Sequence, residues 1–452
     1  MSELELYEGK LEALARERGL DYFPVNFELV PGSFMMEVAI YGLPVRMPHW
    51  SFGVRYFYQL VQHRMGHSRL FEVVFPGNPG RAYLSKNNSP QENTLIVAHV
   101  LGHADFSKNN ELFRRSQEEV GYNIVEKAAE HARRISDAAA IHGDNRVEAV
   151  LDAALSLEAH VDVFAGLRRE PYPEFLDDRN SRSDNPFQAR YQSLEEPRDT
   201  EGTRRRRRAP RPPRPEKDLL WFVANHAPEL DDWERDIFLT VREESFYFYP
   251  VFATQIMNEG WASYWHARLL READFVPQQA YVDAIKCHSD VVRPVAADQQ
   301  VALHVNPYHL GFAMWEKIVE RDGMDGARHI MEQDDDFSFI RNQLTRELAD
   351  ELGLFRFSAR NDGHIKVLEH DLGALHEAIL GPKYNFGAPS VSAAHIRTDG
   401  TLELTHDNSV DGRGLDLERS RRVLDYVQRV WRRPIVLTTV NQAGSTLELT
   451  AP

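Results

Sequence analysis

The spacing of apolar residues predicts a mainly helical chain. Apolar positions recur at helical spacing over 1–20, from 90 to 167, and again from 218 to 355. The sequence Ser-Pro-Gln-Glu at 89–92 is typical of a helix N-terminus, so we expect a helix to begin there. By contrast, 36–53 alternates between apolar and polar residues and predicts a strand that turns at its prolines.

The pattern changes in the final part of the chain. The segments 396–407 and 433–440 predict strands, and 417–431 between them predicts an amphipathic helix. The apolar face of that helix comprises Leu417, Val423, Leu424, Val427, Val430 and Trp431. We therefore predict a small α/β domain at the C-terminus.

The segment 168–217 interrupts the helical pattern. It is rich in Arg, Asp, Pro and Ser and poor in aliphatic residues, so it predicts a largely disordered insertion. Within it, 202–217 holds eight Lys or Arg against one Glu. We interpret the arginine run 204–208 as a solvated linker. The alternative is an electrostatic arm for nucleic acid or an acidic partner, although no aromatic residues are interleaved for base stacking.

These patterns divide the chain into four parts. They are an N-terminal, mostly helical half of a core (1–167), the Arg/Pro-rich insertion (168–217), a second helical half of the core (218–355) and the small α/β domain (356–452).

Composition narrows the class of protein. Among 452 residues, 42% are hydrophobic and 27% charged, which is typical of a globular protein. The single cysteine, Cys287, cannot form an internal disulfide and favours a reducing compartment. The acidic N-terminus lacks the pattern of a secretory signal, and no apolar stretch is long enough to span a bilayer. We expect a cytoplasmic protein, and the net charge of −16 argues against nucleic acid as a general partner.

Two histidines provide the first candidate chemistry. His99 and His103 are four residues apart on a predicted helix, so their side chains lie one turn apart on one face. Such a pair can chelate Zn²⁺ or another divalent transition metal. The spacing is that of the zincin motif HExxH, but Val100 stands where that motif has its catalytic Glu. The alternative is a pair of packed or surface histidines.

The block from Met257 to His266 provides the second candidate. On a helix, Glu259, Ser263 and His266 form one polar stripe among bulky aromatic residues. Burying three such groups without partners would be costly, which points to a shared role. With His99 and His103, Glu259 completes a gluzincin-like ligand set within a zincin-like helical core, and His266 is a further candidate ligand. The alternative is a buried polar network that ties two helices together.

Other residues could support such a site. The rings would be held by a second shell, for which Asp105, Asn109, Asn110, Ser263 and His288 are candidates. His266 or Asp105 would replace the missing glutamate as a catalytic base. Cys287 is next to His288, but adjacent side chains diverge, so we interpret Cys287 as a core residue. The sequence Asn-Pro-Tyr at 306–308 predicts a turn or a helix start.

These motifs together resemble the SpoVR family, the stage V sporulation protein R-like proteins. The resemblance extends over nearly the whole chain except 168–217, and the block 257–266 is its most specific part. It also rests on the following segments: 47–53, 78–83, 99–110, 288–289, 306–311, 336–340, 411–416 and 431–434.

The resemblance implies a role in spore cortex formation or, in bacteria that do not sporulate, in a stress-response pathway. It also implies two partners, an AAA+-type serine protein kinase and a von Willebrand-type metal-site protein. Two hypotheses follow. The protein is a partner of that kinase system with a His/His/Glu metal site, or it is a metal-dependent hydrolase of gluzincin-like ancestry acting on a peptide or peptidoglycan-related substrate. Val100 in place of Glu favours the first, and the polar stripe on an aromatic helix favours the second.

Overall fold

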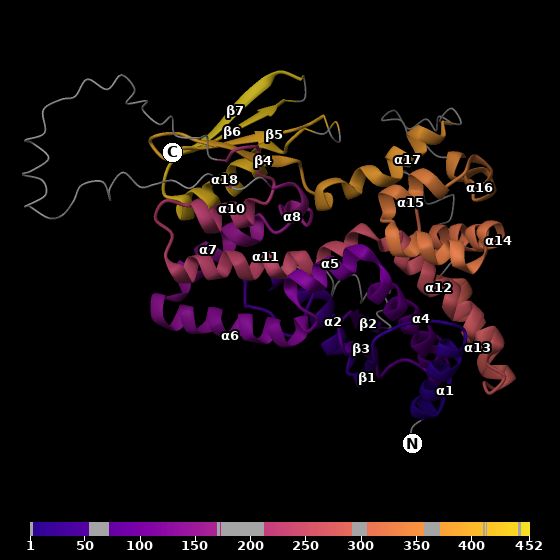
Figure 1. Cartoon of the computed structure of the whole chain (residues 1–452). Coiled ribbons are helices and arrows are strands. Elements are labelled where there is room, and N and C mark those ends of the chain that lie inside the picture. The colour runs from indigo at the N-terminus through magenta and orange to yellow at the C-terminus, as the bar shows by residue number, and fades with distance from the viewer. Residues whose placement is uncertain are drawn as a thin grey trace, which may run out of the picture.

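The computed structural model is mainly helical and carries a small α/β part at the C-terminus, which confirms the predicted fold class at this level (Figure 1). It describes residues 3–53, 72–169, 172, 212–291, 305–356, 371–409, 412, 414–441 and 444–452. In these residues, no helix combines the length and the apolar character that crossing a membrane requires.

The N-terminal part begins with helix α1 and contains a three-stranded sheet. Its elements are α1 (Glu3–Glu17), β1 (Val25–Val30), β2 (Glu72–Phe75) and β3 (Gly80–Ser85). β3 is the central strand and pairs in parallel with β1 and antiparallel with β2. α1 confirms the helix expected over 1–20.

The strand expected over 36–53 is wrong, because none of these residues lies in a strand. Helix α2 (Gly32–Tyr41) occupies this position and ends at Gly42, which adopts a left-handed conformation with φ of 77°. Met35, Met36, Val38 and Ile40 are all buried. An apolar run this short fits both periodicities, so the pattern alone could not distinguish a strand from a buried helix.

The predicted helices from 90 to 167 are confirmed. They are α4 (Pro90–Asn109), α5 (Glu111–Val120), α6 (Ile124–His142), α7 (Asp144–Ser156) and α8 (Ala165–Arg168). α4 begins at a capping box in which the Ser89 hydroxyl accepts from the Glu92 N–H and the Glu92 carboxylate accepts from the Ser89 N–H.

The predicted helices from 218 to 355 are confirmed too. They are α10 (Leu219–His226), α11 (Asp232–Ala253), α12 (Gln255–Glu272), α13 (Gln278–Val291), α14 (Pro307–Gln333), α15 (Asp336–Gln343), α16 (Arg346–Glu351) and the 3₁₀ turn η3 (Leu354–Arg356). α17 (Leu372–Leu380) and the irregular turn η4 (Gly381–Gly387) then lead into the C-terminal sheet.

One hydrophobic core surrounds α12, which packs between α4 and α14 (Figure 1). Three tryptophans, Trp261, Trp265 and Trp315, are fully buried there. The indole N–H of Trp315 donates to the Met257 carbonyl at 2.9 Å, so the polar edge of this ring is satisfied. α12 is therefore enclosed on both sides, as the bulky residues of its sequence require.

The C-terminal prediction is confirmed. Strands β4 (Val391–Ile396), β5 (Leu402–His406), β6 (Ile435–Val440) and β7 (Thr446–Ala451) form one sheet in chain order. β5 and β6 are parallel, and α18 (Leu417–Trp431) connects them as the predicted amphipathic helix. Its Leu424, Val427, Val430 and Trp431 are buried.

The sheet shares a second hydrophobic core with helices from the first half of the chain. α18 packs against α7, and the Trp431 ring stacks on Phe222 of α10 with centroids 6.0 Å apart. The backbone of Glu216 also pairs with Ala393 of β4 through hydrogen bonds of 2.9 and 2.8 Å. The domain boundary at 356 stays a prediction, but the residues beyond it complete this core.

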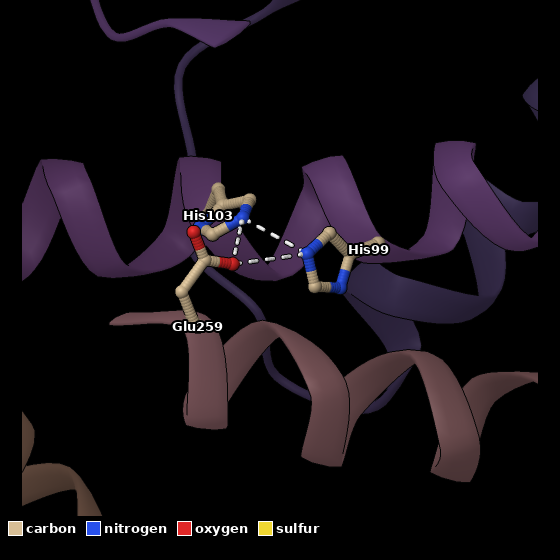
Figure 2. Close-up of side chains that lie close together, drawn as sticks. All are labelled: His99, His103 and Glu259. Atoms are coloured by element: carbon tan, nitrogen blue, oxygen red, sulfur yellow. Dashed lines mark hydrogen bonds and ion pairs between the residues drawn. The ribbon is translucent and has the colours of Figure 1, made fainter. Parts of the chain in front are cut away.

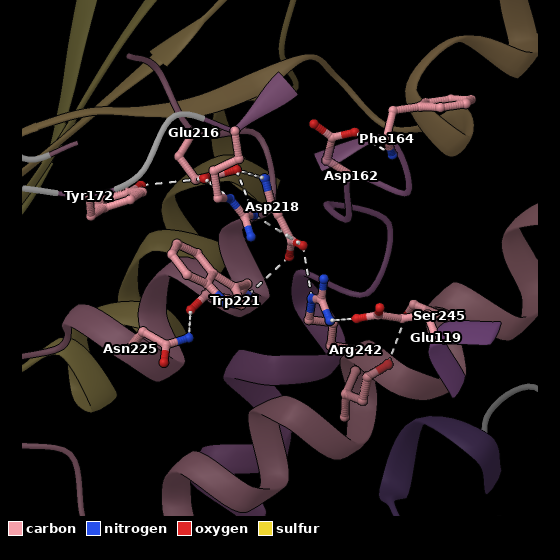
Figure 3. A network of polar contacts seen from close by, with 12 residues as sticks. Glu119, Asp162, Phe164, Tyr172, Glu216, Asp218, Trp221, Asn225, Arg242 and Ser245 are labelled. Atoms are coloured by element: carbon pink, nitrogen blue, oxygen red, sulfur yellow. Dashed lines mark hydrogen bonds and ion pairs between the residues drawn. The ribbon is translucent and has the colours of Figure 1, made fainter. Parts of the chain in front are cut away.

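A polar network joins the two described ends of the predicted insertion (Figure 3). The Arg169 guanidinium donates to both carboxylate oxygens of Glu216 at 2.8 and 3.1 Å. Nearby, the fully buried Asp218 carboxylate accepts from Arg242 and from the N–H of Trp221, in the first turn of α10. The described residues on the two sides of the predicted insertion therefore contact each other. The predicted disorder of 168–217 falls almost entirely on 170–171 and 173–211, outside the described residues.

The shared core predicts which helices a substitution in the C-terminal part will destabilise. Trp431→Ala removes a fully buried indole and should lower the free energy of unfolding by about 3–5 kcal/mol. Because Trp431 packs on α10, hydrogen exchange should accelerate in α7 and α10 as well as in the sheet. Arg421→Ala, at an exposed position of the same helix, should change neither quantity. Acceleration confined to 391–452 would contradict a shared core.

Candidate metal centre

Helix α4 places His99 and His103 on one face, as the four-residue spacing predicts (Figure 2). The Nε2 atoms of the two rings lie 3.0 Å apart. The His99 side chain is 4% exposed and that of His103 is 12% exposed. The pair is therefore enclosed, with His103 nearer to solvent.

Helix α12 brings Glu259 to the same point. Its Oε2 atom lies 3.5 Å from Nε2 of His99 and 3.4 Å from Nε2 of His103. Two ligand atoms about 2.0–2.1 Å from a tetrahedral ion lie about 3.3 Å from each other. The three atoms thus have the mutual spacing of one triangular face of a coordination shell, and each comes from a residue type that binds transition metals.

Glycines at the contact points let the helices approach this closely. A Cβ atom on Gly102 of α4 would lie 2.7 Å from the Cα of Ala262, and one on Gly260 of α12 would lie 2.3 Å from the backbone of Gly311 in α14. Gly102 directly precedes His103, and Gly260 directly follows Glu259. The contacts that set the spacing of the helices therefore flank the candidate ligands.

The N-terminus of α12 is held by a residue from another helix. The Asp336 carboxylate of α15 is fully buried and accepts from the N–H groups of Ile256 and Met257, both at 3.0 Å. Lys383 Nζ lies 3.0 Å from the same carboxylate. Burial raises the pKa of Asp336 to about 6, and Lys383 opposes that shift. A carboxylate at the start of a helix also interacts favourably with its dipole.

The outward-facing ring nitrogens of both histidines have partners. Nδ1 of His103 lies 2.8 Å from Oδ1 of Asn258, an acceptor, so this nitrogen carries a proton. Nδ1 of His99 lies 2.9 Å from Nδ1 of His266. If His99 donates there, both Nε2 lone pairs point toward Glu259. This is the arrangement of metal-bound histidines, whose second nitrogen donates to a neighbouring group.

The charges at this point are strongly coupled. Burial and the neighbouring His103 lower the pKa of His99, which favours its neutral, ligating form. Burial also acts to lower the pKa of His103, but the Glu259 carboxylate outweighs it and the pKa rises. For Glu259, burial acts to raise the pKa, yet His103 and His99 bring it well below the usual range. Glu259 is thus a carboxylate at neutral pH.

Sequence reasoning missed three residues around these groups: Asn258, Glu72 and Tyr308. Burial and the charge of Glu259 raise the pKa of Glu72, on β2, to about 7. The Glu259 carboxylate and burial raise the pKa of Tyr308 well above its usual value. The Tyr308 ring stacks on His99 with centroids 6.1 Å apart. A glutamate in an otherwise apolar strand was the available signal for Glu72.

His266 is placed beside the candidate ligands. It contacts the far nitrogen of His99 and is not one of the three groups whose ligand atoms converge. Ser263, one turn after Glu259, is fully buried, and its hydroxyl makes no hydrogen bond within the described residues. The roles assigned to both side chains stay predictions.

Asp105 and the two asparagines lie in other contacts. Asp105 accepts from the Asp21 N–H at 2.7 Å and from the Trp261 indole at 2.9 Å, so it ties α4 to α12 and to the chain before β1. Asn109 donates to the Asp21 and Asp105 carbonyls. Asn110 caps α5 and donates to the Met331 carbonyl. The structure does not bring these three side chains to the histidine pair.

The third sequence motif is described in part. Helix α13 contains Cys287 and His288, but the side chains of both lie outside the described residues, so the role predicted for His288 stays a prediction. The expected helix start at 306–308 is confirmed, because the Asn306 side chain accepts from the Tyr308 N–H and Pro307 is the first residue of α14.

Comparison with known proteins adds a family and one relative. The sequence model of the family described as SpoVR like protein matches residues 1–377, which confirms the resemblance. The chain is 27% identical over 484 aligned positions to YcgB, an uncharacterized protein of Escherichia coli (strain K12). That alignment covers 98% of this chain and 92% of YcgB. No solved structure matches the chain.

The close approach of α4 and α12 predicts the effect of adding one methyl group. Gly102→Ala places a Cβ against the Ala262 backbone and should lower the free energy of unfolding by about 1–3 kcal/mol. Gly9→Ala, in α1 with no atom within 4 Å of its Cβ, should instead raise stability by up to about 1 kcal/mol. Chemical denaturation measures both. Equal behaviour of the two variants would contradict the contact.

Proposed function

We propose, given that the chain belongs to the SpoVR-like protein family, that its helical core binds one divalent transition metal, with Zn²⁺ as the first candidate. The ligands are His99, His103 and Glu259. This is the gluzincin-like ligand set within a zincin-like core that the sequence predicts. His266 and Asn258 fix the two imidazole rings by accepting at Nδ1.

One observation carries the proposal, namely the convergence of three electron-pair donors. Nε2 of His99, Nε2 of His103 and Oε2 of Glu259 lie 3.0–3.5 Å apart. Oε2 of Glu259 is buried and completes no hydrogen bond in the described residues. Lone pairs at this spacing repel unless a cation or a proton lies among them. A metal ion satisfies all three atoms, whereas a shared proton satisfies two.

The wider role that we propose comes from family membership. The protein would act in the cytoplasm, in a sporulation (spore cortex) or stress-response pathway, as a partner of an AAA+-type serine protein kinase and a von Willebrand-type metal-site protein. The absence of a glutamate at position 100 supports this reading, because the usual base of the zincin reaction is missing.

A second candidate function, the metal-dependent hydrolase, is supported by Glu72. A metal ion here would supply Lewis-acid chemistry. The charges of Glu259 and His103 act on Glu72, and its pKa of about 7 is near the optimum for a general base at neutral pH. It would take the proton of an attacking water, the task we first assigned to His266 or Asp105. Asp105 is committed to Asp21 and Trp261, and His266 lies behind His99.

Metal binding is tested with a double variant and a matched control. The chain with His103→Ala and Glu259→Ala should lose the metal that the unaltered protein retains after zinc loading and dialysis. The control, His329→Ala with Glu320→Ala, also removes one imidazole and one carboxylate, both exposed on α14, and should keep it. Elemental analysis measures the stoichiometry. If the unaltered protein retains no metal, or if the double variant retains it, the proposed site is wrong.

The hydrolase reading is tested at Glu72. In zinc-loaded protein, Glu72→Gln should lower kcat on a quenched fluorescent peptide library by about 10²–10⁴-fold while the zinc content stays unchanged. Asp105→Asn should leave the kcat of the folded, zinc-loaded protein unchanged. A peptide activity that Glu72→Gln does not affect would contradict this role, and zinc-loaded protein without peptide activity would favour the partner role.

A further inference from the structure

The segment 47–53, which contributes to the family resemblance, lies in a part of the molecule that the metal site does not use. A cavity of about 830 Å³ opens between this segment, α7, α10, α18 and the C-terminal sheet. Its lining includes His49, Ser51, Asp152 and His160. It borders the second hydrophobic core, whereas the metal ligands belong to helices of the first.

Three of these residues form a chain of hydrogen bonds. Nδ1 of His49 lies 2.8 Å from the Ser51 hydroxyl, and Nε2 lies 3.1 Å from Oδ1 of Asp152 on α7. The His49 side chain is only 3% exposed. A hydroxyl, an imidazole and a carboxylate in this order form the constellation of a nucleophile, its base and the group that orients the base.

The neighbouring contacts fix the direction of these bonds. The Ser51 N–H donates to Nδ1 of His49 at 3.3 Å, so that nitrogen holds the lone pair and Nε2 holds the proton. Nε2–H then donates to Asp152, and the Ser51 hydroxyl donates to Nδ1. The Trp50 indole also donates to Oδ1 of Asp152, at 2.7 Å, and holds the carboxylate in place. His49 is thus oriented to accept the proton of Ser51.

A second imidazole, that of His160, belongs to the lining of the cavity. Both ring nitrogens of His160 are buried, and the backbone of Pro389 interacts with the ring as a hydrogen-bond acceptor. Burial lowers the pKa of His160 to about 4 and outweighs the opposing effect of the Pro389 backbone, so the ring adds no charge to the cavity lining at neutral pH.

We propose that this cavity is a catalytic site, in which Ser51 attacks the carbonyl carbon of an ester or thioester with an apolar acyl group. His49 is the base and Asp152 orients it. Phe52, Leu155, Phe222 and Leu424 line the cavity and account for the apolar acyl group. This proposal is independent of the metal site.

The reaction needs no group beyond the substrate and water. The Ser51 oxygen forms a bond to the carbonyl carbon while its proton passes to Nδ1 of His49. The bond to the leaving oxygen or sulfur then breaks, and His49 gives the proton to that atom. Water attacks the acyl-serine with His49 again as base, and the proton returns to the Ser51 oxygen as the acid leaves.

A fluorophosphonate probe tests the nucleophile in the full-length protein, because only an activated serine displaces its fluoride. We expect mass spectrometry to find the phosphonyl adduct on Ser51 of the unaltered chain, so this readout does not depend on how any variant folds. Labelling should persist in EDTA, which separates this site from the metal site. No adduct, or adducts only on other serines, would overturn the proposal.

Variants then separate catalysis from a structural role, since His49 accepting from the Ser51 N–H could simply cap the turn that begins at Trp50. His49→Gln and Asp152→Asn should slow labelling of Ser51 and hydrolysis of p-nitrophenyl butyrate by about 10²–10⁴-fold. Ser156→Ala, in the same cavity but bonded to the Ala153 carbonyl, should leave both rates unchanged. Equal labelling of Ser51 in unaltered protein and in folded His49→Gln would overturn the role of His49.

Discussion

The direct backbone contact of α12 with α4 on one side and α14 on the other is the constraint on which the candidate metal centre depends. At Gly102 and Gly260 there is no room for a Cβ, so the helices approach more closely than ordinary side chains permit. At that distance, a Glu side chain on one helix can reach the histidine rings of its neighbour. A site built from His99, His103 and Glu259 is therefore a consequence of helix spacing as much as of residue type.

The same close packing removes water, so every polar group inside needs a partner from the chain. Asp105 accepts hydrogen bonds from the Trp261 indole and the Asp21 N–H. Asp336 accepts from N–H groups in the first turn of α12 and forms an ion pair with Lys383. These two carboxylates act as fixed points for α4 and α12. The His/His/Glu group differs, because three electron-pair donors face one another there.

The sequence predicted the parts of this arrangement that depend on local pattern. The bounds of α18 and the spacing of His99 and His103 on one face follow from helical periodicity alone. The place of Glu72 could not be predicted, because β2 reaches the site only through the tertiary fold. Asp105 is two residues from His103, so helical periodicity alone places it on a different side of α4. Its partner there, Trp261, could not be predicted, because the contact depends on how α4 and α12 pack.

The two hydrophobic cores are not independent, since few residues separate them along the chain. α11 belongs to the second core and α12 to the first, and only Thr254 lies between them. Lys383, in the turn that precedes the C-terminal sheet, donates to the Phe252 carbonyl at the end of α11 and contacts Asp336 at the start of α12. The position of Glu259 therefore depends on a contact from the segment that leads to the sheet. A short motif can supply the ligands, but their convergence requires nearly the whole chain.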